Sequence, residues 1–457
     1  MGITGRAAGE GAVERNILDK LLVWKKSKYR KPLILEGVRQ VGKTWALLEF
    51  GRRCYKNVAY VNFEEQPDYK SLFASSLEPG RLLQNLRMAG RFVIEPEQTL
   101  IVFDECQTCP QALTALKYFC EKAPEYHVVC AVSLPGIELA KPSSFPAGKV
   151  DFLNVYPMTF KEFLKAGGDE NLCAYLESIE NIEHIQEVFF NPLVEKLKLY
   201  FVTGGMPEPV RIWTEDRDTA AFQNEQLRIL RSYRDDFGKY ADPRVANRIS
   251  FIWDSLSSQL ARDNKKFMFS AVKKGARARE YADALQWLIK SRLVYQVPRS
   301  SAPALPLTAC DDLFAFKLYL HDVGLLRVLS KLDTSVLLRG SEVFREFKGA
   351  LAENFVLQEL TALYESTPRY WSELNPPHEV DFLIQRKNEI FPIEVKADTN
   401  VRSPSLRKFK EKFPDASKLR IRISLSNLSL DDDLLNVPLF MVSEIDRLIE
   451  MALNRRS

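Results

Sequence analysis

The sequence has few histidines, scattered cysteines and no long apolar run. Four histidines occur in 457 residues and form no cluster, so nothing in the sequence predicts a Ser-His-Asp triad. The seven cysteines fit reduced thiols better than a disulfide framework, and Cys106 and Cys109 lack the second ligand pair of a closed zinc site. No apolar run approaches the roughly 20 residues of a membrane-spanning helix. We therefore expect a cytoplasmic protein without a membrane partner.

Length and charge set broad limits on the domain organisation. The length predicts two to four domains, and 46% hydrophobic with 27% charged residues is typical of globular chains. The net charge of +4 permits contact with nucleic acid but does not require it. The amino end is small and polar and has no apolar core like that of a signal peptide, so we expect residues 1–12 to be a disordered tail.

Residues 32–52 read PLILEGVRQVGKTWALLEFGR, which predicts a strand, a glycine-rich turn and a helix. The apolar residues Trp45, Leu47, Leu48 and Phe50 suit a helix that packs on a sheet. The pattern GxxxxGKT lets backbone N–H groups surround phosphate oxygens at a helix N-terminus. We expect the lysine to reach the β- and γ-phosphates of ATP and the threonine to ligate Mg²⁺. The predicted nucleotide-binding residues are Gly37, Arg39, Gln40, Val41, Gly42, Lys43, Thr44, Trp45, Asp104 and Ser133.

An acidic pair follows a second apolar segment, TLIVFDE at 99–105. Four consecutive apolar residues predict a buried parallel strand, and Asp104 at its end can hold the magnesium with Thr44. Glu105 can orient and activate an attacking water, which indicates hydrolysis rather than transfer to an acceptor. The alternative is a solvated acid at a strand end. Two more strands are expected, at 58–63 and 127–133.

An extra strand between the two nucleotide motifs, together with the acidic pair Asp104 and Glu105, resembles the AAA-type and related hydrolytic ATPases rather than kinases or GTPases. By that resemblance Ser133 senses the γ-phosphate, although an ordinary strand-end serine is the alternative. Arg39 either contacts phosphate or forms a structural salt bridge. The segments EGVRQVGKT, DECQ, SFPAGKVDFLNVYPMTFKEFL, TGGMPEPV and LYLHDVGLL occur in the same order as in a broad prokaryotic family of AAA-type ATP-binding proteins. Members commonly have arginine where Lys149 stands, which makes this residue a poor arginine finger.

The resemblance also implies a carboxyl-terminal domain like the PD-(D/E)XK nucleases. Before it, the apolar spacing between 181 and 240 predicts a helical lid. Residues 265–297 predict a helix, a turn at Gly275, a second helix and a strand, which is the order of a winged helix. The basic residues Lys273, Lys274, Arg277 and Arg279 face nucleic-acid phosphates on one interpretation and solvent or another domain on the other.

The segment EVDFLIQRKNEIFPIEVKAD, residues 379–398, predicts a β-hairpin with its turn within 385–389. Side chains alternate between the two faces of a strand, so Glu394 and Lys396 share one face and the neighbouring apolar residues the other. If the apolar rows of both strands share a face, Asp381 joins Glu394 and Lys396. Geometry matters here because the pattern ExK alone occurs by chance.

A fourth charged residue belongs to a predicted helix, KGALAENFVLQEL, where Glu353 interrupts an apolar stripe. A carboxylate there is costly unless it is paired or bound to metal. Glu353, Asp381 and Glu394 would hold Mg²⁺ or Mn²⁺, and Lys396 would position the nucleophile. The alternative is a nuclease-like fold kept for binding, with a structural salt bridge between Glu353 and Lys396.

We therefore predict an α/β protein with a P-loop NTPase parallel sheet, a helical lid, a winged-helix-like module and a restriction-endonuclease-like α/β domain. The expected domains are 13–166, 167–240, 241–335 and 336–457. Catalysis is assigned to Lys43 and Glu105 in the first domain and to Asp381, Glu394 and Lys396 in the last. The expected ligands are ATP, ADP and Mg²⁺, with DNA or RNA as partner. An ATP-driven switch that binds a protein partner is the second interpretation, and a homo-oligomer stays open.

Overall fold

The computed structural model describes residues 14–133, 146–262, 265–334, 345–374, 377–397 and 403–456. The chain divides into two compact units. The first contains Met1–Tyr156 and Lys290–Leu293, and the second contains Pro157–Ile289 and Val294–Ser457. The tail predicted for residues 1–12 lies outside the described residues. The four-domain division is finer than this one and stays a prediction.

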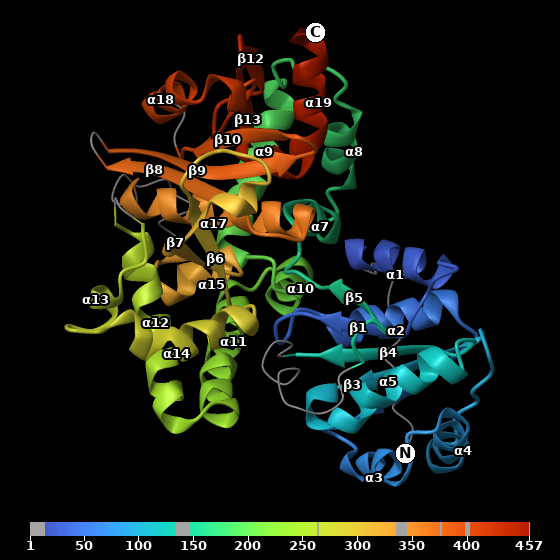
Figure 1. The fold of residues 1–457 in the computed structure, drawn as a ribbon. Coiled ribbons are helices and arrows are strands. Elements are labelled where there is room, and N and C mark those ends of the chain that lie inside the picture. Colours follow the sequence, from blue (N-terminus) through green and yellow to red (C-terminus); the bar gives the residue numbers. More distant parts are fainter. Residues whose placement is uncertain are drawn as a thin grey trace. The chain divides into compact units, whose positions relative to one another are not determined.

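The first unit is built on a parallel five-stranded sheet with the order β2-β3-β4-β1-β5 (Figure 1). Its strands are β1 (Leu33–Glu36), β2 (Asn57–Asn62), β3 (Thr99–Asp104), β4 (His127–Val132) and β5 (Asp151–Asn154). The predictions of strands near 33, 58, 99 and 127 are confirmed. Every residue of β3 and β4 is buried, in keeping with the apolar runs at 100–103 and 128–132.

In the described part of this unit, five α-helices connect and cover these strands: α1 (Asn16–Lys26), α2 (Lys43–Cys54), α3 (Lys70–Ser75), α4 (Pro79–Gly90) and α5 (Pro110–Lys122). The predicted packing of α2 is correct for Leu47 and Phe50, which are buried, and wrong for Trp45 and Leu48, which are each 39% exposed. Lys43, Ala46, Leu47 and Phe50 follow helical spacing along one face, and the other two lie away from it.

The second unit contains most of the helices. The break predicted at Gly204–Gly205 separates α9 from α10. The α-helices are α7 (Phe160–Ala166), α8 (Glu170–Ser178), α9 (Glu187–Thr203), α10 (Pro207–Asp216), α11 (Thr219–Tyr240), α12 (Pro243–Leu260), α13 (Phe269–Val272), α14 (Ala278–Lys290), α15 (Val323–Leu329), α17 (Arg345–Tyr364), α18 (Pro404–Lys412) and α19 (Ile445–Arg456). None of the helices in the described parts of the chain is both long and apolar enough to span a membrane.

A mixed eight-stranded sheet completes the second unit, with the order β12-β13-β11-β10-β9-β8-β6-β7. Its strands are β6 (Val294–Ser300), β7 (Asp311–Leu320), β8 (Arg369–Leu374), β9 (Pro377–Arg386), β10 (Glu389–Val395), β11 (Arg420–Ser424), β12 (Ser429–Asp431) and β13 (Leu434–Pro438). The predicted hairpin is confirmed, because β9 and β10 pair antiparallel with Phe382 opposite Ile393. Helix α17 packs against β7 and β10 of this sheet.

Two of the sequence segments quoted above meet inside the second unit. The carboxylate of Asp322, from LYLHDVGLL, accepts hydrogen bonds from the backbone N–H of Gly205 at 2.6 Å and of Leu325 at 2.8 Å. A Cβ on Gly324 would lie 2.5 Å from the backbone N of Gly204. The close approach of the segments TGGMP and HDVGL therefore depends on glycine at this position.

Candidate functional site

The glycine-rich loop between β1 and α2 has the backbone that its sequence requires. Gln40 and Gly42 have positive φ angles of 64° and 95°. A Cβ on Gly37 would lie 2.6 Å from the carbonyl oxygen of Val155, so the loop starts in close contact with the segment after β5. Lys43 and Thr44 then begin α2, at the end of the helix where backbone N–H groups are unpaired.

Lys43 is turned back onto this loop. Its side chain is buried, and its ammonium donates to the carbonyl oxygens of Gly37 at 3.0 Å and Val38 at 2.9 Å. Burial lowers the pKa of Lys43 to about 8, against the opposing effect of the nearby carboxylates of Glu105 and Asp104. A buried ammonium held only by carbonyl oxygens is a ready partner for a phosphate anion.

Asp104 lies at the carboxyl end of β3 and connects the two predicted motifs. Its Oδ2 accepts from the Thr44 hydroxyl at 2.6 Å and from the Tyr60 hydroxyl at 3.0 Å. Its Oδ1 accepts from the backbone N–H of Glu105 at 2.9 Å. The two predicted magnesium ligands, Thr44 and Asp104, are thus in direct contact. The sequence analysis did not identify Tyr60, which lies on the strand beside β3.

Glu105 has a positive φ of 53°, which is uncommon for a residue other than glycine. Its carboxylate accepts from the Ser133 hydroxyl at 3.3 Å and from the side-chain amide of Gln107. Gln107 in turn accepts from the backbone N–H of Ser133 at 3.3 Å. Burial raises the pKa of Glu105, and the Lys43 ammonium opposes this shift. Glu105 and Ser133, predicted from different strands, therefore share one hydrogen-bonded group with Gln107.

Two other cations of the first unit have acidic partners. Arg39 lies 3.6 Å from Glu64, and Lys149 lies 3.1 Å from Glu121. An ion pair of Lys149 with an exposed glutamate agrees with its poor match to an arginine finger. Trp45 follows Thr44 directly, and its exposed indole lies beside the loop in sequence.

The predicted carboxyl-terminal residues lie on α17, β9 and β10. The register that pairs Phe382 with Ile393 places Asp381 opposite Glu394. The Asp381 carboxylate accepts from the backbone N–H of Val395 at 2.8 Å, and burial raises its pKa to about 7. The Lys396 ammonium lies 2.7 Å from Glu394, whose buried second oxygen, Oε2, has no hydrogen-bond partner. Strand parity therefore brings Asp381, Glu394 and Lys396 to one face, as predicted.

Two lysines outside the hairpin lie close to carboxylates of this region. Glu353 forms an ion pair with Lys265 and accepts from the Tyr319 hydroxyl at 3.1 Å. Lys317 is completely buried, forms an ion pair with Glu379 and lies 3.9 Å from Asp381. The sequence analysis missed both lysines. Lys317 had a usable signal, because it interrupts the apolar strand AFKLYL as Asp381 interrupts EVDFLI.

The carboxyl-terminal residues fit a metal ion only in part. The unpartnered oxygen of Glu394 is a suitable ligand atom. However, within the described ranges no three Asp, Glu, His or Cys side chains are placed to hold a metal ion together. Lys265 pairs with Glu353, so this carboxylate would have to exchange the ammonium for a metal ion.

Comparison with known protein families identifies three regions of the chain. Residues 29–164 match a family model described as an AAA domain. The chain contains an AAA domain. Residues 194–336 and 348–440 match models described only as domains of unknown function, DUF8612 and DUF4143. No protein with a curated description matches the chain.

Several solved structures resemble the chain weakly. A Walker-type ATPase of Pyrococcus abyssi is 14% identical, with 69% of this chain and 95% of that chain covered and a TM-score of 0.44. A STAND protein with a tetratricopeptide-repeat sensor from Pyrococcus horikoshii is 13% identical, with 77% and 46% covered and a TM-score of 0.27. The RuvB branch migration motor of Thermotoga maritima is 13% identical, with 63% and 90% covered and a TM-score of 0.29.

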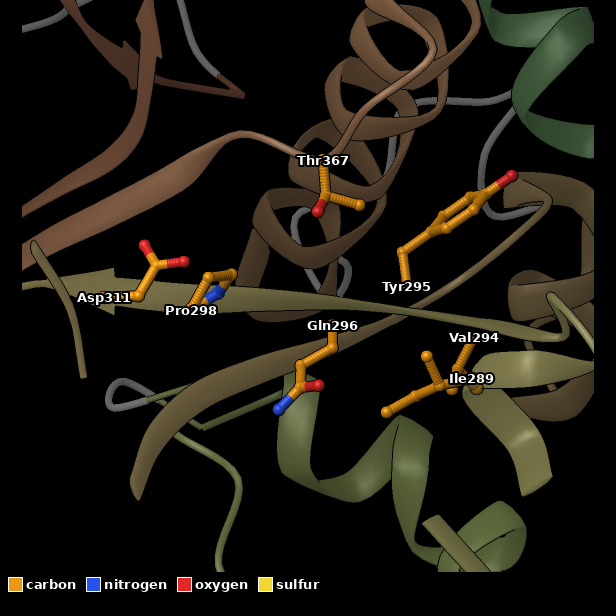
Figure 2. A pocket seen from close by; sticks show the side chains of 7 residues that line it. All are labelled: Ile289, Val294, Tyr295, Gln296, Pro298, Asp311 and Thr367. Atoms are coloured by element: carbon orange, nitrogen blue, oxygen red, sulfur yellow. The ribbon is translucent and has the colours of Figure 1, made fainter. Parts of the chain in front are cut away.

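A cavity of about 330 Å³ in the second unit lies apart from all the predicted site residues. Most of its lining residues come from β6, as Figure 2 shows: Ile289, Val294, Tyr295, Gln296, Pro298, Asp311 and Thr367. Its one ionised group, Asp311, accepts hydrogen bonds from Nε and Nη2 of Arg369, each at 2.9 Å. The predicted nucleotide-binding residues lie in the AAA domain instead.

Proposed function

We propose that the AAA domain binds ATP with Mg²⁺ and hydrolyses it. The contact of the Thr44 hydroxyl with the Asp104 carboxylate at 2.6 Å carries this proposal, because these two groups would hold the metal together. The residues fit the ion in chemistry, since Mg²⁺ prefers oxygen ligands. Bound Mg²⁺ neutralises the phosphate charge during phosphoryl transfer.

The protein groups have separate roles in this reaction. Lys43 exchanges its two carbonyl partners for phosphate oxygens, which compensate its buried charge better. Glu105 orients the attacking water and takes up its proton, which the burial of this carboxylate favours. Ser133 and Gln107 fix the position of Glu105 and would detect the end of the nucleotide.

The test is the replacement Glu105→Gln, which keeps the shape and removes the base. ATP should still bind, and phosphate release should fall by roughly 100-fold or more. The matched control is Glu125→Gln, an exposed acid of the same domain, which should hydrolyse at the unchanged rate. Undiminished phosphate release by Glu105→Gln would refute the assignment.

For the carboxyl-terminal region we propose a nuclease-like domain that acts on or binds nucleic acid under nucleotide control. The facing carboxylates of Asp381 and Glu394, with Lys396 at 2.7 Å from Glu394, support this proposal. Glu353, Asp381 and Glu394 are the candidate ligands of Mg²⁺ or Mn²⁺. A winged-helix-like module, residues 241–335, belongs to the same proposal.

A second candidate function is an ATP-driven protein-interaction switch whose nuclease-like domain binds but does not cleave. The ion pair of Lys265 with Glu353 favours it, because an ammonium there supplies the positive charge that a metal ion would otherwise supply. The buried ammonium of Lys317 near Asp381 favours it as well.

Binding of Mn²⁺ separates the two candidates. It should be measured by calorimetry on the wild type, on Lys265→Met and on Asp381→Asn, beside cleavage of single- and double-stranded DNA and RNA. Binding that Asp381→Asn abolishes supports the cleaving domain. No binding in either the wild type or Lys265→Met supports the binding domain, whether or not the AAA domain hydrolyses ATP.

A further inference from the structure

The positive charge of this chain is concentrated in one short segment. The whole chain has 64 Lys and Arg against 60 Asp and Glu. Residues 265–290 alone contain seven basic residues against the two acids Glu280 and Asp283: Lys265, Lys266, Lys273, Lys274, Arg277, Arg279 and Lys290. This segment therefore accounts for the net positive charge, and the rest of the chain is nearly balanced.

The central four of these cations are exposed and unpaired. Lys273, Lys274, Arg277 and Arg279 form no ion pair with any residue that the structure describes. Lys273 only lies over the Phe251 ring, 5.6 Å from its centroid. Arg211, an exposed cation elsewhere in the second unit, has a carboxylate partner, Glu208 at 2.7 Å. A group of exposed cations that form no ion pair, outnumbering the two acids beside them, is complementary to a polyanion.

Three of these cations lie between two helices, and Arg279 lies in the first turn of the second helix. Helix α13 ends at Val272, Gly275 with a φ of 80° makes the turn, and α14 starts at Ala278. Helix α12 precedes them and β6 and β7 follow, in the order expected of a winged helix (Figure 1). In helix-turn-helix proteins the helix after the turn enters the major groove.

The two faces of α14 differ sharply. Its inner face is buried through Tyr281, Ala284, Leu285, Trp287 and Leu288. Its outer face is exposed and consists of Arg279, Ala282, Asp283 and Gln286, at helical spacing. These side chains are small or bear hydrogen-bonding groups, which suits contact with base edges.

The loop between β6 and β7 has a different role. Leu307 in this loop is buried, and its backbone N–H donates to the Gln385 side chain at 2.9 Å. Leu307 therefore anchors the loop on β9, while most of its other residues are exposed. Residues 301–310 contain no lysine or arginine, so the cations that could contact a polyanion lie in the turn and on α14.

We propose that α14 binds in the major groove of double-stranded DNA. Arg279, Asp283 and Gln286 face base edges, while Lys273, Lys274 and Arg277 contact phosphates. Duplex DNA fits better than duplex RNA, because the major groove of an RNA helix is too narrow to admit a helix. The outer face of α14 itself has no exposed aromatic side chain on which the bases of a single strand could stack, and the 44% exposed ring of Phe251 nearby lies against Lys273. This inference names the nucleic acid of the proposed function but does not depend on hydrolysis or on a metal site.

The test uses the full-length chain and a labelled 25-base-pair duplex of random sequence. Fluorescence anisotropy should show that Lys273→Gln with Lys274→Gln weakens binding by roughly 10- to 100-fold at 0.1 M salt. The slope of log K against log salt should become shallower by about two. Single-stranded DNA and duplex RNA of equal length should bind more weakly than the DNA duplex.

The matched control removes two adjacent cations from another part of the chain. On α18, Arg407 is exposed and Lys408 is half-buried, and both face Glu411. Arg407→Gln with Lys408→Gln should leave duplex affinity within about twofold. ATP binding by both double variants reports on their folding. No duplex binding by the wild type at 50 mM salt, or an equal loss in both double variants, would overturn the proposal.

A second pair of substitutions tests base contact itself. Asp283→Ala with Gln286→Ala should change which sequences are selected from a random duplex pool, while the salt slope stays unchanged. Identical selected sequences for wild type and variant would overturn the major-groove placement of α14. The Glu105→Gln result decides ATP hydrolysis separately.

Discussion

Buried ionisable residues in the second unit are held by specific partners. The Glu359 carboxyl accepts from the backbone N–H of Phe160 at 2.9 Å, and Asp322 accepts from backbone N–H groups of α15 and of Gly205. Burial raises the pKa of both carboxyls, to about 8 for Glu359 and about 6 for Asp322. Their hydrogen bonds do not fully compensate the loss of water.

Glu359→Gln should therefore change the pH dependence of stability. A carboxyl whose pKa is raised by folding does not lower the free energy of unfolding at a pH where it is protonated in both the folded and the unfolded state. As the pH rises from about 4.5 to 8, it lowers the free energy of unfolding increasingly. Relative to Glu359→Gln, the wild type should lose roughly 2–4 kcal/mol of unfolding free energy from pH 5 to pH 8. Urea unfolding at several pH values measures this difference. Parallel profiles would contradict it, and Glu183→Gln, at an exposed acid, should follow the wild type.

Lys317→Met should destabilise the second unit. It removes the counter-charge of Glu379 and Asp381 from a completely buried position, which typically costs 3–5 kcal/mol. Adding Glu379→Gln should recover part of the loss, because one uncompensated carboxylate is then gone. Chemical unfolding of the single and double variants measures the effect. A single variant as stable as the wild type would show that Lys317 contributes no net stability.

At the residue scale, local sequence patterns predicted several residues of the candidate sites. They did not predict the residues that reach these sites from distant parts of the chain. Thr44 and Asp104 followed from motif spacing, and Asp381 with Glu394 followed from strand parity. Lys265 and Lys317 come from 88 and 62 residues away from their partners Glu353 and Glu379. No periodicity relates such positions, because only the tertiary fold brings them together.

At the element scale, the positions of the strands in the sequence were predictable, but the order of the strands in the sheet was not. The apolar runs identified β1, β3 and β4, yet β4 lies between β1 and β3 while β2 lies at the edge. Strand order depends on crossover connections, and the apolar runs do not encode them. The face of α2 was predicted in part, because apolar Trp45 and Leu48 lie off the buried face.

Gly324→Ala should disturb the contact between α15 and the segment after α9. The new Cβ would lie 2.5 Å from the backbone N of Gly204, and backbone atoms cannot move aside independently. We expect a loss of roughly 1–3 kcal/mol. The control Gly349→Ala lies in α17 with nothing within 4 Å of the new Cβ, and should stabilise by about 0.5–1 kcal/mol. Equal effects of the two variants in thermal unfolding would exclude the steric explanation.

At the scale of the whole molecule, the chain returns once to its first unit. Lys290–Leu293 follow α14 but belong with Met1–Tyr156. Within that unit Arg292 lies 2.6 Å from Glu36, the last residue of β1 before the glycine-rich loop. No sequence motif marks this return, so a linear division into domains could not include it.

The two-unit division predicts a selective response to nucleotide. The loop from Gly37 to Thr44 lies wholly in the first unit. ATP with Mg²⁺ at about 100 times its Kd should stabilise that unit by about 2.7 kcal/mol, since a ligand stabilises the folded state that binds it. For a unit of this size the shift in Tm is roughly 5–10 °C.

Differential scanning calorimetry with and without ATP should show that one transition shifts and the other does not. Lys43→Ala should abolish the shift, because the phosphate partner is gone, while Lys122→Ala at an exposed site of the same unit should keep it. A single transition that shifts as a whole would mean that the units unfold cooperatively. In that case nucleotide binding in the AAA domain would stabilise the carboxyl-terminal sheet against unfolding as well. The nucleotide could then influence the carboxyl-terminal region without a separate conformational change.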